Sequence, residues 1–421
     1  MKRRNLLAWA IALSAGFSFA QVSIDIPAAQ RRAAIPIAIV PVPGDQEQMD
    51  YIIASDLFKS GYFQPIAPDR FSNRPNSPNE IDYGQFAQLG AQYVVLGRLL
   101  GNAGQAQFVM NQVGDQAVVM NEEMRGASNR MVAHATADRI LEVLTGKRGA
   151  FATRIAYVLE QSGSNSRRYA LVVSDIDGGN RQEIASSDQP ILSPTWSPDG
   201  RQLAYMTYAD YQAQIVIQSA EGGGRRVVLQ SDSTSSAPAW SPDGSQLAVS
   251  LSTGEGNMDI FLVDVGSGAQ KRLTNHAGID TEPAFSPDGA SIYFTSDRAG
   301  SPQIYRMGRN GGGAERVVVG SNYSSNAELS PDGQYLALTR QSGGGYQIGL
   351  YELGSGRFSA LTSGRLDEGS TFAPNGEMLM YTAMEGGRSV LKLINLKGEV
   401  VQTLSDPGGR LRDPAWAPYS R

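Results

Sequence analysis

The sequence predicts a multidomain protein: a small α/β N-terminal domain followed by a six-bladed β-propeller, an all-β ring closed by pairing of its N- and C-terminal strands. Two observations predict this architecture. A seven-residue motif recurs six times in the second half of the chain, each time beside short apolar runs separated by turns. Glycine is also abundant, at 47 of 421 residues or about 11%, against a typical value of about 7%, which indicates many tight turns.

The motif reads Pro-x-Trp-Ser-Pro-Asp-Gly in its clearest form. Its copies, including three weaker ones, occupy residues 194–200, 238–244, 283–289, 327–333, 370–376 and 414–420. Successive copies lie 44, 45, 44, 43 and 44 residues apart. A constant period of this length is the signature of a repeat architecture in which each copy is one structural unit.

Each copy predicts one turn and several strands. In Ser-Pro-Asp-Gly, proline fixes φ at the first corner of a type I turn, aspartate bonds to nearby backbone N–H groups, and glycine takes the positive φ that follows. Apolar runs then follow the first copy at residues 203–207, 215–217 and 226–229. Together with the Pro-x-Trp segment they make four short strands, which is the β-meander of a propeller blade.

An aromatic residue occupies the same position in most copies. Because this position lies on a strand two residues before the second proline, we expect its side chain to pack between neighbouring blades and to have no chemical role. The residues are Trp196, Trp240, Phe285, Phe372 and Trp416. The fourth copy has Leu329 instead, which buries less area.

The ring is predicted to close through the two ends of the repeat region. The last copy stops one strand into its blade, and three unassigned strands lie far upstream, at residues 154–159, 170–174 and 181–184. Residues 154–421 then hold six blades of about 45 residues each. Closure of this kind removes the exposed strand edges of an open sheet.

The start of the chain, residues 1–20, reads as a secretory signal peptide. Lys2, Arg3 and Arg4 precede the apolar run 6–20, which ends in small residues suited to cleavage after Ala20. A membrane anchor is the alternative, but 15 apolar residues are too few to span about 30 Å of hydrocarbon. Cleavage leaves 33 basic and 41 acidic residues, a net charge of −8. This acidic balance argues against nucleic-acid binding, which needs clustered Lys and Arg.

Residues 21–34 are expected to form a flexible, partner-binding N-terminal segment, and residues 35–146 a small α/β domain. Within that domain, apolar patterns and stop signals predict three helices, at 45–60, 81–89 and from Ser128 to Gly146. Predicted strands or extended segments occupy 35–42, 63–67, 93–96, 107–113 and 116–120. A short basic linker, residues 147–153, leads into the propeller.

The sequence offers few groups for catalysis. It has no cysteine, two histidines, and none of the nucleophile-elbow, phosphate-loop, dinucleotide-binding or zinc-protease motifs. We therefore expect no enzyme activity, no cofactor and no metal. His134 lies within the last helix of the small domain and is expected to be a surface or packing residue. His276 is expected in a solvated loop, with partner contact as the alternative.

Acidic residues gather at one end of the predicted blades. We expect solvated loop charge, although such carboxylates could in principle bind a cation. These residues are Asp280, Glu282, Glu328, Asp367 and Glu368.

The combination of signal peptide, small α/β domain and Pro-x-Trp-Ser-Pro-Asp-Gly repeats resembles the TolB family, periplasmic proteins of the Tol–Pal system. The resemblance covers the entire chain. It includes Gln-Val-Ser-Ile-Asp-Ile at residues 21–26 with Ile-Ala-Ile-Val-Pro at 37–41, and Leu-Phe-Lys-Ser-Gly-Tyr-Phe at 57–63. Val-Ala-His-Ala-Thr at 132–136 and Leu-Thr-Gly at 144–146 also belong to it.

The resemblance implies a monomeric, non-catalytic scaffold that supports outer-membrane integrity and cell division. Such proteins bind the peptidoglycan-associated lipoprotein Pal through one propeller face, which places them peripherally at the outer membrane, and the inner-membrane protein TolA through an extended N-terminal segment. The TolA-binding residues implied are Gln21, Val22, Ser23, Ile24, Asp25 and Ile26. The Pal-binding residues implied are Thr234, Ala237, Asp280, Thr281, Glu282, Ser325, Asp367 and Glu368.

Two other classes of function stay open from the residues alone. One is a periplasmic propeller that binds a small ligand or a metal in its channel, against which the scarcity of histidine counts. The other is a peptidase or lyase, which would need a catalytic domain that we do not find in this chain.

Overall fold

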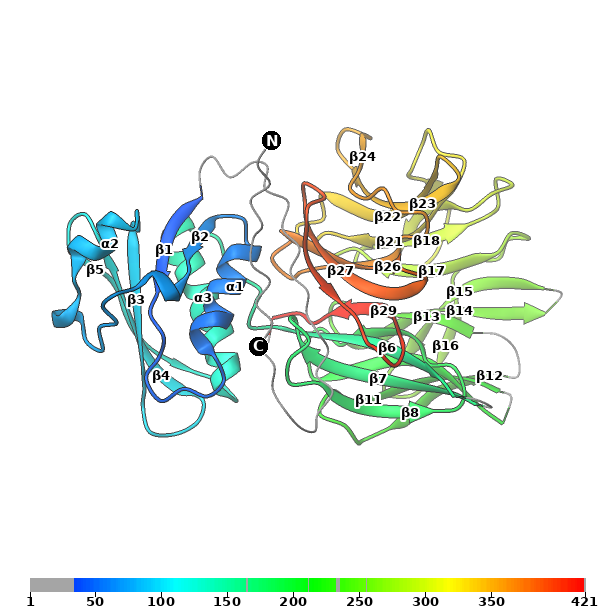
Figure 1. Ribbon diagram of the computed structural model, residues 1–421. Helices are drawn as coiled ribbons and strands as arrows, with labels where there is room; N and C mark the ends of the chain where they lie inside the picture. The colour runs from blue at the N-terminus through cyan, green and yellow to red at the C-terminus, as the bar shows by residue number, and fades with distance from the viewer. Residues whose placement is uncertain (1–33, 164–165, 211, 232–234, 255, 420–421) are drawn as a thin grey trace.

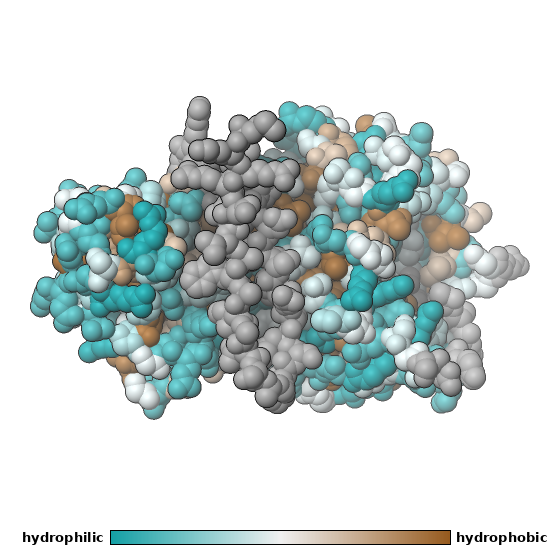
Figure 2. All heavy atoms as spheres, viewed as in Figure 1, coloured by the Kyte–Doolittle hydropathy of each residue, from teal (hydrophilic) through white to brown (hydrophobic). Residues whose placement is uncertain are grey.

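The computed structural model describes residues 34–163, 166–210, 212–231, 235–254 and 256–419, arranged as an α/β domain beside a β-propeller (Figure 1). The predicted fold class is confirmed. Among the helices in these ranges, none has both the length and the apolar character needed to cross a membrane. In the view of Figure 2 the described surface is mostly hydrophilic, with small, separate apolar patches on both parts.

The α/β domain is built on one five-stranded sheet in the order β2-β1-β3-β4-β5. β1, β2 and β3 run parallel, whereas β4 and β5 add antiparallel strands. The strands are β1 Ile35–Ile39, β2 Phe63–Ile66, β3 Tyr93–Leu99, β4 Gln105–Gln112 and β5 Val118–Arg125. The helices are α1 Met49–Lys59, α2 Tyr83–Gln88 and α3 Asn129–Thr145, with single 3₁₀ turns at Pro68–Arg70 and Pro78–Glu80.

Alternate side chains of the central strands enter two different cores. Ile37 and Ile39 pack with α1 and α3 on one face of the sheet, while Ala38 and Val40 pack with Phe86 of α2 on the other. Period-two alternation of this kind is expected of a strand that is covered on both faces. The domain is therefore a three-layer α/β/α arrangement in which α1 and α3 form the layer nearest the propeller (Figure 1).

The helix predicted at 45–60 begins later, at Met49, where the Asp45 carboxylate accepts the N–H of Met49 at 2.7 Å. The limits of α3 are as predicted and follow from identifiable caps. The hydroxyl of Ser128 accepts a hydrogen bond from the N–H of Met131, 3.2 Å away, at the start of α3. Gly146 follows its last turn, as predicted. The predicted hairpin is also present, but its second strand is β5, Val118–Arg125, and so extends five residues past the predicted end at 120. Apolar periodicity missed this extension because it is mostly polar and its residues are partly or fully exposed.

The propeller consists of six four-stranded sheets. Five blades are continuous in sequence, and in each the first strand is innermost. Blade 1 is β9 Leu192–Trp196, β10 Gln202–Ala209, β11 Gln212–Ser219 and β12 Arg226–Ser231; blade 2 is β13 Ser235–Trp240, β14 Gln246–Gly254, β15 Asn257–Asp264 and β16 Gln270–Arg272. Blade 3 is β17 Asp280–Phe285, β18 Ser291–Ser296, β19 Gln303–Gly308 and β20 Glu315–Arg316. Blade 4 is β21 Ser324–Leu329, β22 Tyr335–Ser342, β23 Gly345–Glu352 and β24 Phe358–Ala360; blade 5 is β25 Glu368–Phe372, β26 Met378–Glu385, β27 Arg388–Asn395 and β28 Val400–Leu404.

The sixth blade joins the two ends of the propeller, as predicted. Its inner strand is the last of the chain and its other three strands come first: β29 Arg410–Trp416, β6 Arg154–Ser162, β7 Arg167–Asp175 and β8 Gln182–Ser187. β29 and β6 are antiparallel, with Leu411 opposite Leu159 and Trp416 opposite Ile155. The closed ring therefore depends on backbone hydrogen bonds between segments about 250 residues apart.

The repeated turns have the predicted geometry. In the first copy the Ser197 hydroxyl donates to the Asp199 carboxylate at 2.6 Å, and the same carboxylate oxygen accepts the N–H of Arg201 at 3.1 Å. Gly200 has a φ of +69°, a left-handed conformation that glycine adopts without steric cost. The same serine–aspartate bond recurs in the second, third and fourth copies.

The repeated aromatic side chains pack between blades, as predicted. The indole N–H of Trp196 donates to the Ala415 carbonyl of blade 6 at 3.0 Å, and that of Trp240 donates to Thr195 of blade 1 at 3.3 Å. Trp416 donates to the Thr153 hydroxyl, which precedes β6, at 2.7 Å. The indoles of Trp196 and Trp240 therefore add a directional bond to the apolar contact between neighbouring sheets, whereas that of Trp416 bonds within blade 6.

The α/β domain packs against blades 5 and 6 at one end of the propeller, the end at which the inner strands finish. Tyr419 donates to the carbonyl of Gly149 at 2.8 Å, and Lys147 pairs with Glu377 at 2.8 Å. Part of the core of the α/β domain is continuous with residues of blades 5 and 6. We call this end the proximal face, and we call the opposite end, where the inner strands begin, the distal face.

Trp416→Ala should destabilise the propeller more than any surface change, because it removes a buried indole from the closing strand. Trp416 is only 6% exposed, and truncation of such a side chain costs about 3–5 kcal/mol. We expect a clear drop in the midpoint of thermal unfolding followed by circular dichroism.

Tyr51→Ala is the matched control, since Tyr51 on α1 is 58% exposed. A surface truncation of this kind changes stability by about 0.5 kcal/mol or less. Equal midpoints for the two variants would contradict the role assigned to the closing strand.

Candidate partner-binding face of the propeller

A β-bulge marks the start of every inner strand. In each blade the pairing of the inner strand with its neighbour shifts by one residue, and the residue at the shift has a left-handed backbone. These six residues are Ser193, Ala237, Glu282, Asn326, Gly369 and Asp413. Bulges re-aim the side chains around them. Here the bulged residues line a cavity of about 350 Å³ along the propeller axis, and the residues just before them lie at the distal face.

The predicted Pal-binding positions fall into exposed and buried groups. Glu368 is exposed, whereas Ala237, Thr281 and Glu282 are half-buried. Asp280, Ser325 and Asp367 are buried. Thr234 lies outside the described residues.

The expectation of solvated loop charge is wrong for Asp280. Its carboxylate is fully buried and accepts two hydrogen bonds from one nitrogen of Arg298, at 2.9 and 2.8 Å. The guanidinium also lies 4.9 Å from the ring centre of Tyr305. Asp280 therefore holds the entrance of β17 against the end of β18.

Asp367 corrects the same expectation. It is 3% exposed, and its carboxylate accepts the N–H of Gly364 at 2.9 Å. The chain around it is fixed further by the N–H of Asp367, which donates to the carbonyl of Tyr346. The carboxylate thus shapes the loop that enters β25, and it leaves the neighbouring Leu366 51% exposed.

The distal face carries exposed apolar side chains, two of which, Ile279 and Leu366, lie in loops that the resemblance implies to face Pal. Ile279 and Leu366 lie in loops entering inner strands, Val319 precedes β21, and Met384 is near the end of β26. Their exposed fractions are 40%, 51%, 59% and 44%, respectively. Val319 and Met384 were missed, because apolar periodicity identifies strands but not which of their side chains, or those of adjoining loops, point outward at the end of the ring.

The channel carboxylates are already engaged by the protein. Glu282 accepts the Thr295 hydroxyl and the N–H of Asn326 in the next blade, both at 2.7 Å. Glu328 accepts the N–H of Phe372 at 3.0 Å. Burial raises the pKa of Glu328 to about 7, although this hydrogen bond acts to lower it. Both carboxylates thus link neighbouring blades, which reduces what they offer to a cation.

The two histidines occupy different environments. His276 is exposed, as predicted, and its Nδ1 accepts the N–H of Gly278 at 2.9 Å. His134 is fully buried between the two domains, which fits the packing alternative and rules out the surface one. The predicted TolA-binding residues 21–26 lie outside the described residues.

Comparison with known proteins identifies both parts of the chain. Residues 22–117 match the model of the TolB amino-terminal domain, and residues 141–420 match that of the TolB beta propeller domain. The Tol-Pal system protein TolB of Bordetella pertussis is 38% identical, with 96% of this chain and 92% of that protein aligned. TolB of Xanthomonas campestris is 40% identical, with 98% of each aligned.

A solved structure extends the likeness to three dimensions. The crystal structure of TolB from Acinetobacter baumannii superposes with a TM-score of 0.84 at 33% identity, covering 95% of this chain and all of the other. The similarity therefore includes both domains and not the propeller alone.

Asp280→Ala should destabilise the propeller, because it leaves the Arg298 guanidinium, only 16% exposed, without its anion. Removing one partner of a buried ion pair costs about 3–5 kcal/mol. We expect a lowered midpoint of thermal unfolding and faster proteolysis near residue 280.

Glu123→Ala provides the control, since it breaks an exposed pair with Arg125 in which the side chains are 44% and 70% exposed. Exposed pairs contribute about 1 kcal/mol at most. An Asp280→Ala midpoint as high as that of this control would exclude a bracing role.

Proposed function

The chain belongs to the TolB family of Tol-Pal system proteins, and from this we propose that it is a periplasmic scaffold that binds Pal through the distal face and TolA through residues 21–26. The family is a non-enzymatic component of that system. This agrees with the absence of catalytic motifs noted in the sequence. The proposed role is to connect a lipoprotein of the outer membrane with a protein of the inner membrane.

The observation that carries the Pal proposal is the group of exposed apolar side chains on the distal face. Ile279, Val319, Leu366 and Met384 are each 40–59% exposed at this face, where burying them would favour association. Thr281 lies two residues after Ile279 and directly before the bulge residue of blade 3. Ala237 is the bulge residue of blade 2, the preceding blade. Apolar side chains with polar residues around them are typical of specific protein interfaces.

The proximal face is the weaker candidate for the same partner. The α/β domain already packs there, through contacts such as Tyr419 to Gly149 and Lys147 to Glu377. A folded partner domain needs about 800 Å² of surface on each side of a stable interface. The distal face provides open surface without displacing this packing.

For TolA, the proposal rests on the resemblance and on the residue types of the segment. Ile24 and Ile26 alternate with Ser23 and Asp25, so an extended segment would present both isoleucines on one side. Alternation of this kind suits addition of a strand to the edge of a partner sheet, where backbone bonds give affinity and alternate side chains give specificity.

Ala237→Arg and Thr281→Arg should each weaken binding of purified Pal by about 100-fold, because each places a charge in a largely apolar contact. Position 237 is left-handed already with alanine, so arginine adds no new backbone strain. Isothermal titration calorimetry measures the effect, and circular dichroism checks the fold.

The control is Val118→Arg, which adds the same charge at a 56% exposed site on β5 of the α/β domain. It should bind Pal as the unaltered protein does. Unchanged Pal affinity in both propeller variants would remove the distal face from consideration.

Deleting residues 21–26 from the mature protein should abolish TolA binding and leave Pal binding unchanged. Within the segment, Ile24→Ala with Ile26→Ala should weaken TolA binding, whereas Ser23→Ala should not, because only the isoleucines act as anchors. Pull-down with purified TolA and Pal separates the two outcomes. Retention of TolA by the deleted protein would refute the assignment.

A further inference from the structure

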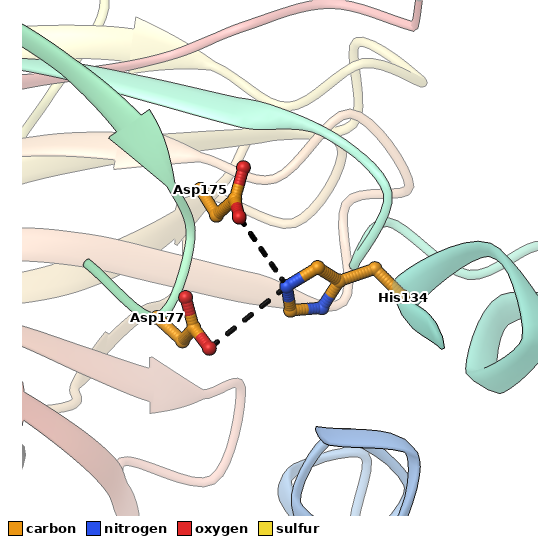
Figure 3. Close-up of side chains that lie close together, drawn as sticks. All are labelled: His134, Asp175 and Asp177. Carbon is orange, nitrogen blue, oxygen red and sulfur yellow. Dashed lines mark ion pairs between the residues drawn. The ribbon is translucent and has the colours of Figure 1, made fainter. Parts of the chain in front are cut away.

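A group of buried charges lies between the α/β domain and blade 6. Two members come from α1, two from α3, and two from the end of β7 and the turn after it. Figure 3 shows three of them, His134, Asp175 and Asp177. We call this group the interdomain charge cluster: Asp56, Lys59, Arg130, His134, Asp175 and Asp177. Four of the six side chains are at most 3% exposed, and Arg130, at 23%, is the most exposed.

The imidazole of His134 faces carboxylates with both of its nitrogens. Nδ1 lies 2.5 Å from the Asp56 carboxylate within the α/β domain. Nε2 points across the interface and lies 3.8 and 3.9 Å from the carboxylates of Asp175 and Asp177. A neutral imidazole has one N–H donor and one lone pair, whereas the protonated ring donates from both nitrogens. Only the protonated ring is attracted to anions on both sides.

Counting charges supports the same protonation state. The cluster holds three carboxylates, and Lys59 and Arg130 supply two positive charges. Lys59 pairs with Asp56 at 3.1 Å, and Arg130 pairs with Asp177 at 2.6 Å and with Asp175 at 3.3 Å. A third positive charge on His134 makes this buried group neutral, which greatly lowers the cost of burying it.

The pKa directions of His134 and Asp177 agree with this geometry, whereas burial outweighs His134 and Arg130 at Asp175 and raises its pKa. Burial by itself would lower the pKa of His134, but the charges of Asp56, Asp177 and Asp175 outweigh it and hold the pKa above its ordinary 6.5. Burial likewise opposes ionisation of Asp177, yet His134, Lys59 and Arg130 lower its pKa to about 2.

A metal ion is the other occupant that these side chains suggest, because His134, Asp175 and Asp177 place donor atoms within 4.8 Å of one another. The carboxylate oxygens that face Nε2 are the same atoms that bind Arg130. Gly179 leaves room for this guanidinium, since a Cβ there would lie 2.2 Å from it, and the ion pairs to Asp175 and Asp177 hold it. A divalent cation would therefore have to enter beside a fixed positive charge. The proton fits the site better.

We propose that protonated His134 is a pH-sensitive latch that holds the α/β domain against the propeller. In the closed arrangement, in which the two domains are in contact, the imidazolium lies within 4 Å of three carboxylates, two of them from blade 6. When the domains move apart, the ring returns to water and loses those partners. Deprotonation at higher pH removes the attraction from the closed arrangement and loosens the contact between the domains.

The sign of the pH effect follows from linkage. A group whose pKa is raised in the closed arrangement stabilises that arrangement below its ordinary pKa, about 6.5 for histidine, and the stabilisation is lost as pH rises through the raised value. Asp138 on α3 acts in the same direction, because burial raises its pKa to about 7 although it accepts the N–H groups of Ala152 and Phe151. Each unit of the histidine shift changes the ratio of open to closed molecules up to tenfold.

The chain permits a direct test because it contains two histidines and no cysteine. In mature protein labelled with ¹⁵N-histidine, the ring nitrogens of His134 should keep imidazolium shifts to higher pH than those of exposed His276. His276→Gln assigns the two sets of signals. If His134 is neutral throughout, or titrates at or below the pH of His276, the latch is refuted.

The domain contact is measured in the same protein with spin labels on Val118→Cys and Val227→Cys, one exposed site on each domain. The distance distribution should be narrow at pH 6 and broader at pH 8.5. In His134→Gln it should be broad at both values, while His276→Gln should behave like the unaltered protein. Equal distributions at both pH values in the unaltered protein would overturn the proposal.

Asp177→Asn keeps the ring and removes one facing carboxylate, so it tests the mechanism even where His134→Gln folds poorly. It should lower the pH at which His134 titrates. Zinc chloride added at micromolar concentration should leave the His134 signals unchanged. A shift of these signals that is complete at one equivalent of zinc would refute the latch and indicate a metal site. No partner protein is present, so the result is independent of the proposed function.

Discussion

The structure depends on the pairing of β29 with β6, which closes the propeller. β6 begins directly after the linker at residues 147–153, and β29 is the last strand, so both ends of the ring meet in one blade. That blade also carries Asp175 and Asp177 on its third strand and following turn. Because the register of β29 on β6 fixes the blade, it also fixes where these carboxylates meet α3. The register of this pairing in blade 6 therefore affects both the closure of the ring and the packing of the two domains.

The repeat divides the propeller into two unlike faces. The Ser-Pro-Asp-Gly turns all lie at the proximal end, where each is short and internally bonded, as Ser197 is to Asp199. The bulged strand starts all lie at the distal end, where the preceding loops differ in length and side chains. A uniform face suits packing against one fixed domain, whereas variable loops provide specific contacts. The distal face, which has the more varied side chains, is therefore the one that remains open to partners.

The sequence predicted the ring because its signal is local and repeated. Turn chemistry, strand periodicity and the aromatic position all act within one blade, and a cap such as Ser128 acts within one turn. Prediction from the sequence failed for side chains whose burial depends on residues far away in the chain. Asp280 was expected in solvent but meets Arg298, 18 residues away across a hairpin. His134 meets Asp56, which is 78 residues away, and blade carboxylates that only domain packing brings near.

The composition of the domain interface determines how firmly the domains are held. An apolar contact of the same area would hold them at any pH, and replacing buried charges by apolar groups often stabilises a protein. The charge cluster gives up some of that stability and makes its own part of the contact depend on one proton, beside the apolar core shared with blades 5 and 6. Arg130 keeps its bonds to Asp175 and Asp177 whichever form His134 takes, so deprotonation weakens the contact without removing every link. The domains can therefore loosen while the chain between them, already bonded through Gly149 to Tyr419, keeps them together.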